Sequence, residues 1–560
     1  CRWSILRCLN DMVLPLFPFV NVGAIFETPM ASMPYEQWDN SFVGRSIIGQ
    51  HLCNSRRLLF CSVKKTILRT ALDRTVTRAK KAEDDYDYPE DLSTVVLNRP
   101  KAVLAKSLPD PETRLSYSVF GQAFDELHFL EPSALRMAYT HPMDDGQERT
   151  FKVKFEGEGV DDYGGPYREF FSQICEELQA LRRPSEDSQN GAMSAKMEKE
   201  RKNRESNDSS FSSTSEYSGL TNEPECVLPL FIPCPNQKKA VGENQKHFMV
   251  NPKTGRLTGG SSQLYLEMYN FVGQFLGIAL RSNVHLDLSL PSVVWKVLVG
   301  EALSWDDFET FDANSCHVLR ELVALCEDDS LGETKENELI QEILDELSWS
   351  ATTSDGQEID VRSGLLRGGN EDDDDEEEEE DDDDEEEIDG NHHHHHHQRQ
   401  KWDVDTILRY CQGNVKCRLL ESHAALRAMS EGLRSVVPSC ALGMFAWYEL
   451  ELRICGRADI DIDLLKRNTE YDDDVSPDQP SIVWLWEVLE EFEHQQRCDF
   501  LRFVWARSHL PPTAAEFKQK FKVQSPVTDG ARQTPDLYLP KAHTWCVCCC
   551  DCCWFLWLYF

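Results

Sequence analysis

Apolar side chains recur at helical spacing in several long stretches of this chain, and each such stretch is predicted to be a helix. Phe120, Phe124, Leu127 and Leu130 mark the first clear case. Further helices are predicted at Tyr265–Arg281, Val293–Val299, Val318–Leu325, His423–Val437, Trp447–Ile454 and Ile482–Phe492.

One segment combines a strand, a glycine-rich turn and a helix. Residues Phe151–Phe155 alternate apolar and basic side chains, as a half-buried strand does. The turn Glu156–Gly165 follows, and Pro166 stands where a helix begins. A phosphate-binding loop is a weak alternative, because the turn fits neither phosphate-loop spacing and its two aspartates would repel an anion.

The first 115 residues give the weakest signal. Lys64–Lys81 is basic and places Ile67, Leu68 and Ala71 on one helical face. Contact with a membrane or with nucleic acid is one interpretation. A helix that packs its apolar face and leaves its charges in solvent is the better one.

The helix predicted at Tyr265–Arg281 carries two glycines on one side, Gly273 and Gly277. Small residues at this spacing let two helix backbones approach closely. We therefore expect a close helix crossing inside a helical domain.

Two segments interrupt the predicted helices. Residues 184–225 are rich in Ser, Asn, Glu and Lys, and residues 337–400 contain the acidic run Glu371–Glu387 followed by His392–His397. Both compositions predict disordered insertions. The histidines lack a spacing that would fix a coordination geometry, so we expect no metal site there.

The charge and length of the chain narrow the classes of function. The chain has 560 residues and a formal net charge of -39, which argues against a nucleic-acid binder. The apolar run Met12–Phe26 is broken by prolines and is too short to span a bilayer. Most of the twenty cysteines are scattered through apolar patterns, which is typical of free thiols. We expect a cytoplasmic protein, and a C-terminal fragment of a longer one.

A polar loop near the end of the chain, Leu539–Thr544, is suited to presenting an exposed nucleophile. Trp545 and Cys546 follow it, and the last residues are crowded with cysteines and aromatic side chains. Upstream, the polar stretch Asp472–Asp478 contains a proline and is predicted to be a hinge between two units.

Several blocks of sequence then stand in a particular order. They are FKVKFEGEGVDDYGGPYREFF, FVGQFLGIALRSNVHLDLSLPSVVWKVLVG, MSEGLRSVVPSCALGMFAWYELELRICGRADIDIDLLKRNTEY, IVWLWEVLEEF and LPKAHT. This order, from Phe120 to Thr544, resembles the HECT-domain ubiquitin ligases, and the WARSHLPPT stretch is most similar to the giant HERC-type members.

The resemblance implies an α+β, bilobal HECT module. Residues 116–472 would form a mostly helical N-lobe, and residues 473–544 a small, truncated α/β C-lobe. Residues 1–115 would be a poorly defined upstream region, and residues 545–560 match nothing in the family. The implied partners are a ubiquitin-conjugating enzyme, ubiquitin and protein substrates, and no cofactor or metal is implied.

The family docks its conjugating enzyme on the smaller subdomain of the N-lobe. By resemblance, this surface would include the apolar side chains Val294, Trp295, Leu298 and Phe308, which we expect to be exposed. The alternative is that these four residues belong to the core.

The family's chemistry passes through a cysteine that follows the Leu539–Thr544 loop. A thiolate accepts ubiquitin as a thioester, and a substrate lysine then attacks that thioester. His543 and Thr544 would hydrogen-bond around the thiol or the developing oxyanion. In this chain Cys546 comes one residue later than the family's cysteine.

Three interpretations of the tail remain. Cys546 replaces the nucleophile, the Cys546–Cys553 cluster binds zinc or copper, or the tail is non-native and the module is inert. The predicted function is ubiquitin transfer. The alternatives are an inactive module that only docks a conjugating enzyme, and an acidic binder of basic proteins acting through Glu371–Glu387.

Overall fold

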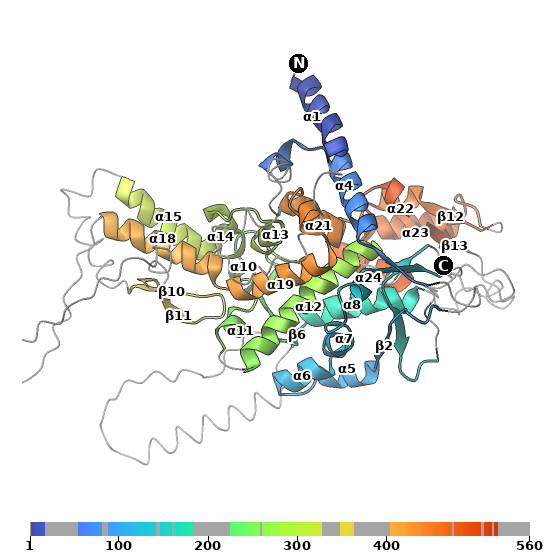
Figure 1. Ribbon diagram of the computed structural model, residues 1–560, viewed down its shortest axis with the longest axis horizontal. Helices are drawn as coiled ribbons and strands as arrows, with labels where there is room; N and C mark the ends of the chain where they lie inside the picture. The colour runs from blue at the N-terminus through green and yellow to red at the C-terminus, as the bar shows by residue number, and fades with distance from the viewer. Residues whose placement is uncertain are drawn as a thin grey trace, which may run out of the picture. The chain divides into compact units, whose positions relative to one another are not determined.

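The computed structural model of this chain combines helices with small sheets (Figure 1). It describes residues 2–16, 54–80, 88–141, 146–159, 162, 164–182, 225–257, 260–327, 348–362, 404–457, 459–472, 475–505, 509–517 and 520–524. This mixture agrees with the predicted α+β class. Within these ranges, no helix is long and apolar enough to cross a membrane.

Several predicted features lie outside the described residues. They are the acidic run Glu371–Glu387, the histidines His392–His397, the loop Leu539–Thr544, Cys546 and the rest of the tail. Inside the second predicted insertion, however, residues 348–362 are described. There β10 (Ser350–Thr352) pairs antiparallel with β11 (Glu358–Asp360), so the prediction of disorder is wrong for this hairpin.

The chain divides into two units, and the larger one comprises Cys1–Pro233, Lys246–Leu303 and Ala424–Phe560. Its described helices are α1 (Arg2–Leu16), η5 (Arg56–Leu58), α4 (Cys61–Arg74), α5 (Arg99–Ala105), α6 (Pro111–Tyr117), α7 (Val119–Leu127), η6 (Ala134–Arg136), α8 (Gly165–Gln179), α11 (Pro252–Arg256), α12 (Gly260–Ser282), α13 (Ser292–Val299), α19 (His423–Val436), α20 (Ser439–Leu442), α21 (Trp447–Cys455), α22 (Ile462–Arg467), α23 (Pro480–Glu491), α24 (His494–Trp505) and η8 (Ala514–Glu516). Its strands are β1 (Thr77–Arg78), β2 (Thr94–Leu97), β3 (Met137–Thr140), β4 (Glu148–Arg149), β5 (Lys152–Phe155), β6 (Leu181–Arg182), β7 (Glu225–Cys226), β8 (Phe231–Pro233), β9 (Phe248–Val250), β12 (Thr469–Tyr471) and β13 (Phe521–Val523).

Helices α12 and α19 cross at the centre of the larger unit. A Cβ atom built on Gly273 would lie 1.9 Å from the carbonyl oxygen of Met429. One built on Gly432 would lie 1.8 Å from the carbonyl oxygen of Asn270, and one on Gly277 would lie 2.7 Å from Val436. Both helix backbones therefore meet where neither has a side chain, which confirms the predicted role of Gly273 and Gly277.

The predicted strand, turn and helix are confirmed as β5 and α8. Strand β5 pairs in parallel with β2, and its apolar residues face the core. The buried carboxylate of Asp162 closes the turn, accepting hydrogen bonds from the amides of Val153 at 2.8 Å and Gly164 at 3.0 Å. This carboxylate therefore joins the turn to β5 and to the start of α8, which is a role in the fold.

The basic helix predicted at Lys64–Lys81 is shorter than expected and ends at Arg74 as α4. Ile67, Leu68 and Ala71 are buried, which confirms the packing face. Lys64 is also buried and pairs with Glu449 of α21. Helix α4 is therefore an integral part of the larger unit.

The smaller unit comprises Cys234–Gln245 and Ser304–His423. Its described elements are α10 (Pro235–Lys239), α14 (Trp305–Phe311), α15 (Ala313–Glu327), α18 (Val404–Leu420) and the β10–β11 hairpin. The buried amide of Asn236 donates to the carbonyls of Glu309 and Thr310 at 3.1 Å, and its oxygen accepts from the amide of Ala313 at 2.7 Å. Asn236 thus fixes α10 against the end of α14 and the start of α15.

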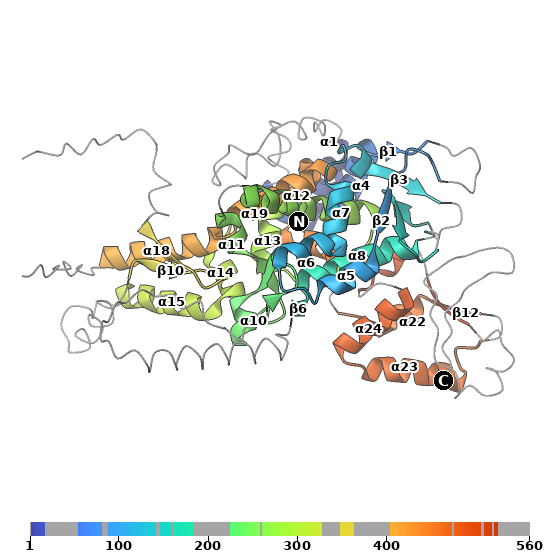
Figure 2. The ribbon, with the colours of Figure 1, turned by 90° about the horizontal axis from the view of Figure 1, so that it is seen from below.

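A second apolar core, which we call the C-terminal core, is formed by residues from Ile460 to Val523 of the larger unit. Figure 2 shows α22, α23 and α24 close to β12, which pairs in parallel with β13. Tyr471 and Val475 both pack against this core, although they stand on either side of the expected boundary at residue 472. Residues 460–471 therefore pack in the same core as α23 and α24, on the other side of the expected division at residue 472.

Candidate functional site

The chain enters the C-terminal core through a short junction after α21. Helix α21 ends at Gly456, whose amide donates to the carbonyl of Leu452 at 3.1 Å. Gly456 has a φ of 79°, and a Cβ atom there would lie 3.2 Å from the ring of His285 and from the carbonyl oxygen of Leu510. Only glycine satisfies both the dihedral angle and the close approach.

The next residue pairs with a segment much later in the chain. Arg457 forms an isolated antiparallel bridge with Leu510. On the other side, the amide of Leu286 donates to the carbonyl of Ile454 at 2.9 Å. Main-chain hydrogen bonds thus fix the direction in which the chain leaves α21.

Asp287 makes charged contacts with the C-terminal core at the same junction. Its carboxylate pairs with Arg502 of α24 and lies 3.9 Å from Nδ1 of His509. Burial lowers the pKa of His509, and the charge of Asp287 opposes this shift. Near neutral pH, the positive charge that pairs with Asp287 is therefore that of Arg502 rather than that of His509.

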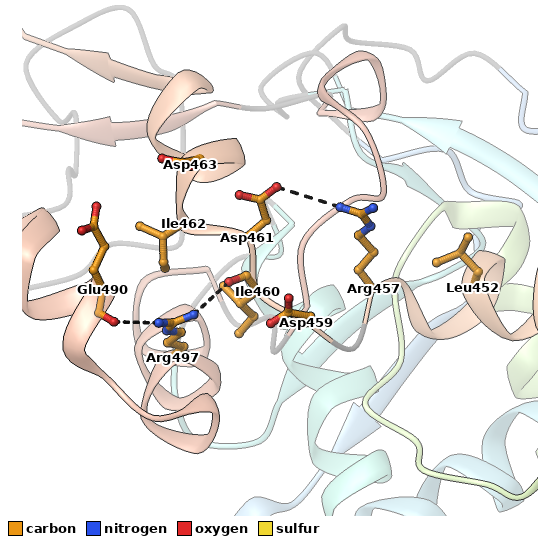
Figure 3. A pocket seen from close by; sticks show the side chains of 9 residues that line it. All are labelled: Leu452, Arg457, Asp459, Ile460, Asp461, Ile462, Asp463, Glu490 and Arg497. Carbon is orange, nitrogen blue, oxygen red and sulfur yellow. Dashed lines mark hydrogen bonds and ion pairs between the residues drawn. The ribbon is translucent and has the colours of Figure 1, made fainter.

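An open pocket of about 710 Å³ lies beside the junction (Figure 3). Arg497 donates to the carbonyls of Ile460 at 3.4 Å and Glu490 at 2.8 Å, while Arg457 lies 4.0 Å from Asp461. The lining residues are Leu452, Arg457, Asp459, Ile460, Asp461, Ile462, Asp463, Glu490 and Arg497. None of these lining residues is a cysteine or a histidine, so the pocket contains neither a thiol nor an imidazole.

Buried cysteines in the described part of the chain are poor nucleophiles. Burial raises the pKa of Cys316 and Cys498 to about 11 and that of Cys411 to about 12. The thiolate form is the reactive one, so such thiols are inert near neutral pH. Within the described ranges, no cluster of His, Cys, Asp or Glu could hold a metal ion.

The structure corrects the expected exposure of the four apolar docking residues. Val294, Trp295 and Leu298 are buried on α13, which packs against α21, and the indole of Trp295 donates to the carbonyl of Leu290 at 3.2 Å. Phe308 is buried on α14 of the smaller unit, where the guanidinium of Arg418 lies 5.6 Å from its ring centroid. The structure thus supports the alternative that these four residues belong to the core. Val294, Trp295 and Leu298 are buried in the larger unit, and Phe308 is buried in the smaller unit.

The other predicted site residues, His543, Thr544 and Cys546, lie outside the described residues. The junction residues Asp287, Arg502 and His509 were missed. Local patterns carry no signal for them, since Asp287 and Arg502 are separated by 215 positions. Gly456 follows α21, but no pattern in the sequence indicates its closeness to His285.

Comparison with known proteins assigns the chain to a family. Residues 224–550 match the HECT-domain (ubiquitin-transferase) family, which is more than half of the sequence. The chain belongs to the HECT-domain family. It is 27% identical to E3 ubiquitin-protein ligase HERC2 of Homo sapiens over 547 residues, covering 97% of this chain and 8% of that protein.

Two further relatives agree. HERC2 of Mus musculus is 27% identical over 492 residues, covering 87% of this chain and 8% of the relative. The probable E3 ubiquitin-protein ligase HECTD4 of Homo sapiens is 24% identical over 528 residues, covering 91% of this chain and 10% of the relative. The HERC-type resemblance is thus confirmed, and the chain spans about a tenth of the length of these relatives.

The matched region contains the junction at Gly456 and the ion pair of Asp287 with Arg502 beside it. The match begins at residue 224 and continues to residue 550, past the Leu539–Thr544 loop and Cys546. Helix α4 lies outside the matched residues, although its side chains contact α21 within them. Residues upstream of the HECT match therefore make contacts with residues inside it.

Proposed function

We propose that this chain is the catalytic region of a HECT-type ubiquitin ligase, which accepts ubiquitin from a conjugating enzyme as a cysteine thioester and passes it to substrate lysines. The observation that carries this proposal is the HECT match across residues 224–550, which includes the loop presenting the thiol. The relatives named as ubiquitin-protein ligases support the same reaction class.

The proposed nucleophile is Cys546. Its thiolate attacks the carbonyl of the thioester that joins ubiquitin to the conjugating enzyme. The cysteine of the conjugating enzyme then leaves as a thiolate. A substrate lysine amine then attacks the new thioester, losing a proton, and Cys546 is released as the thiol. His543 and Thr544 would donate hydrogen bonds to the oxyanion that develops in each step.

Burial makes the core thiols of the described residues poor candidates for the nucleophile. Cys498 lies in the C-terminal core, but burial raises its pKa to about 11. The first exchange converts one thioester into another of similar energy, so positioning contributes more to this step than strong activation of the thiol. The junction at Gly456 would serve as the hinge between the two lobes of the module.

We propose that the conjugating enzyme docks on helix α15 of the smaller unit. Val318 is 58% exposed and Leu325 is 37% exposed. With the half-buried Leu322, they follow one face of the helix at helical spacing. Such an apolar stripe fits the helix-sized contact that anchors a protein partner.

Substitutions on α15 test this docking surface. Val318→Asp and Leu325→Asp should each weaken binding of a conjugating enzyme about ten-fold, because each buries a charge at the contact. Ala324→Asp places the same charge on another exposed side of α15 and should leave the affinity unchanged. Equal binding by all three variants would contradict the assignment.

A charging assay tests the proposed function. The chain is mixed with a conjugating enzyme already loaded with ubiquitin and is then separated with and without a reducing thiol. We expect a ubiquitin adduct that the thiol removes, that Cys546→Ala abolishes and that Cys548→Ala retains. Binding of the conjugating enzyme without any adduct would contradict the proposal and identify a module that only docks.

A further inference from the structure

Glu516 lies where three parts of the larger unit meet. It ends η8, which follows α24, and its Oε1 lies 2.7 Å from Nζ of Lys65 on α4. Its Oε2 lies 2.7 Å from Nη1 of Arg453 on α21, and the hydroxyl of Thr513 donates to Oε1 at 3.0 Å. One carboxylate therefore joins an upstream helix, the last helix before the junction and the segment after α24.

The environment of Glu516 makes these contacts stronger than ordinary surface pairs. The side chains of Glu516 and Arg453 are 18% and 17% exposed, and that of Lys65 is 34% exposed. Burial by itself would raise the pKa of Glu516, but the hydrogen bond from Lys65 and the charge of Arg453 outweigh it and lower the pKa. The carboxylate is thus ionised near neutral pH and loses these contacts only as the pH falls through that lowered pKa.

Helix α4 is itself fixed to the main part of the larger unit. The buried Lys64 pairs with Glu449 of α21, and Arg281 of α12 donates to the carbonyl of Leu72 at 3.2 Å. Lys65 is therefore held on a rigid element when it binds Glu516. Glu516, in contrast, lies after α24, and the adjacent Phe517 packs against the C-terminal core.

We propose that Glu516, Lys65 and Arg453 form a clasp that restrains the C-terminal core against α4 and α21. The chain enters that core through the short junction at Gly456, so a second attachment at Glu516 limits rotation about the junction. The clasp would connect sequence upstream of the HECT match to the mobility of the matched C-terminal core.

A consequence for ubiquitin transfer rests on the proposed function. The loop Leu539–Thr544 follows the C-terminal core in the sequence. If that loop presents the thiol, the clasp limits how far the thiol travels between the conjugating enzyme and a substrate. Opening the clasp should then raise the rate of ubiquitin discharge.

Hydrogen exchange of the full chain tests the clasp without any ubiquitin. In Glu516→Ala we expect the junction amides of Gly456 and Leu510 to exchange about ten-fold faster, because two charge-assisted contacts of a half-buried carboxylate are lost. Lys65→Glu should have an effect at least as large, because it places two carboxylates together. Lys65→Arg keeps the charge and should retain slow exchange.

Glu470→Ala is the matched control. Glu470 pairs with Lys520 at 2.9 Å, and both residues belong to the C-terminal core segment, so its loss should leave the junction amides unchanged. Unchanged exchange in both Glu516→Ala and Lys65→Glu would overturn the clasp, whatever the transfer assay shows. Absence of any ubiquitin adduct on the unsubstituted chain would instead overturn the proposed function, and the exchange result would still decide the clasp.

Discussion

The α12–α19 crossing and the junction of the C-terminal core are held together in different ways. At the crossing, two backbones meet at Gly273 and Gly432 with no side chain between them. At the junction, charged groups far apart in the sequence meet, such as Asp287 with Arg502. Close backbone packing tolerates almost no displacement, whereas charged contacts can break and re-form in water. The larger unit therefore contains a rigid region and a region suited to movement.

The largest effect is expected at the crossing. Gly432→Val places side-chain atoms where the carbonyl oxygen of Asn270 lies, so the two helices must separate. We expect the free energy of unfolding to fall by about 4 kcal/mol or more, measured by denaturant unfolding. Gly260→Ala, at the exposed start of α12 with nothing within 4 Å, should change it by less than about 0.5 kcal/mol. Similar losses in both variants would refute a rigid crossing.

A smaller and more local effect is expected at the junction. Gly456→Ala forces a positive φ on alanine and brings its Cβ close to His285 and Leu510. We expect a cost of about 1–3 kcal/mol that appears as local opening of the C-terminal core. Gly157→Ala also has a positive φ but nothing within 4 Å, so the difference between the two variants measures the close approach. If Gly456→Ala destabilised α12 and α19 as much as the C-terminal core, the contrast between the two regions would be wrong.

The smallest effect is a pH dependence in α21, which leads to the junction. Burial raises the pKa of Glu451 to about 7, and a hydrogen bond from Trp295 opposes this. The folded state therefore binds more protons than the unfolded state between pH values of about 5 and 7, so stability falls as the pH rises through this range.

The variant Glu451→Gln tests that dependence. It should reduce the fall in the free energy of unfolding between about pH 5 and pH 8 by on the order of 2 kcal/mol, measured by denaturant unfolding at each pH. Glu487→Gln, on an exposed part of α23, should leave the slope as it is. An unchanged slope in Glu451→Gln would show that another group carries the dependence, such as Glu177, whose pKa burial also raises to about 7.

Local patterns predicted the fold well where contacts are local. Helical spacing located α8, α12, α19, α21 and α23, and the glycines of α12 predicted a close crossing. The same patterns failed for Trp295 and Phe308, because an apolar residue in a short helix has the same sequence signature in a core as on a surface. Only the three-dimensional packing of α13 on α21, and of Arg418 over Phe308, distinguishes the two.

The candidate site was harder to predict, for a physical reason. Lys65 and Glu516 are separated by 451 positions, and no periodicity relates two residues at such a distance. The expected boundary at Asp472–Asp478 rests on composition, and a polar, proline-containing loop can cross a core as well as separate two. Tyr471 and Val475 pack against the same core on either side of residue 472.

Native-state hydrogen exchange of the unsubstituted chain can separate the two regions. We expect the amides of the C-terminal core, in α23, α24 and β13, to exchange together and faster than the amides at the crossing of α12 and α19. That result would establish a C-terminal core able to open while the rest of the larger unit stays folded. Exchange of both regions at a single rate would contradict it, since the junction would then be as rigid as the crossing.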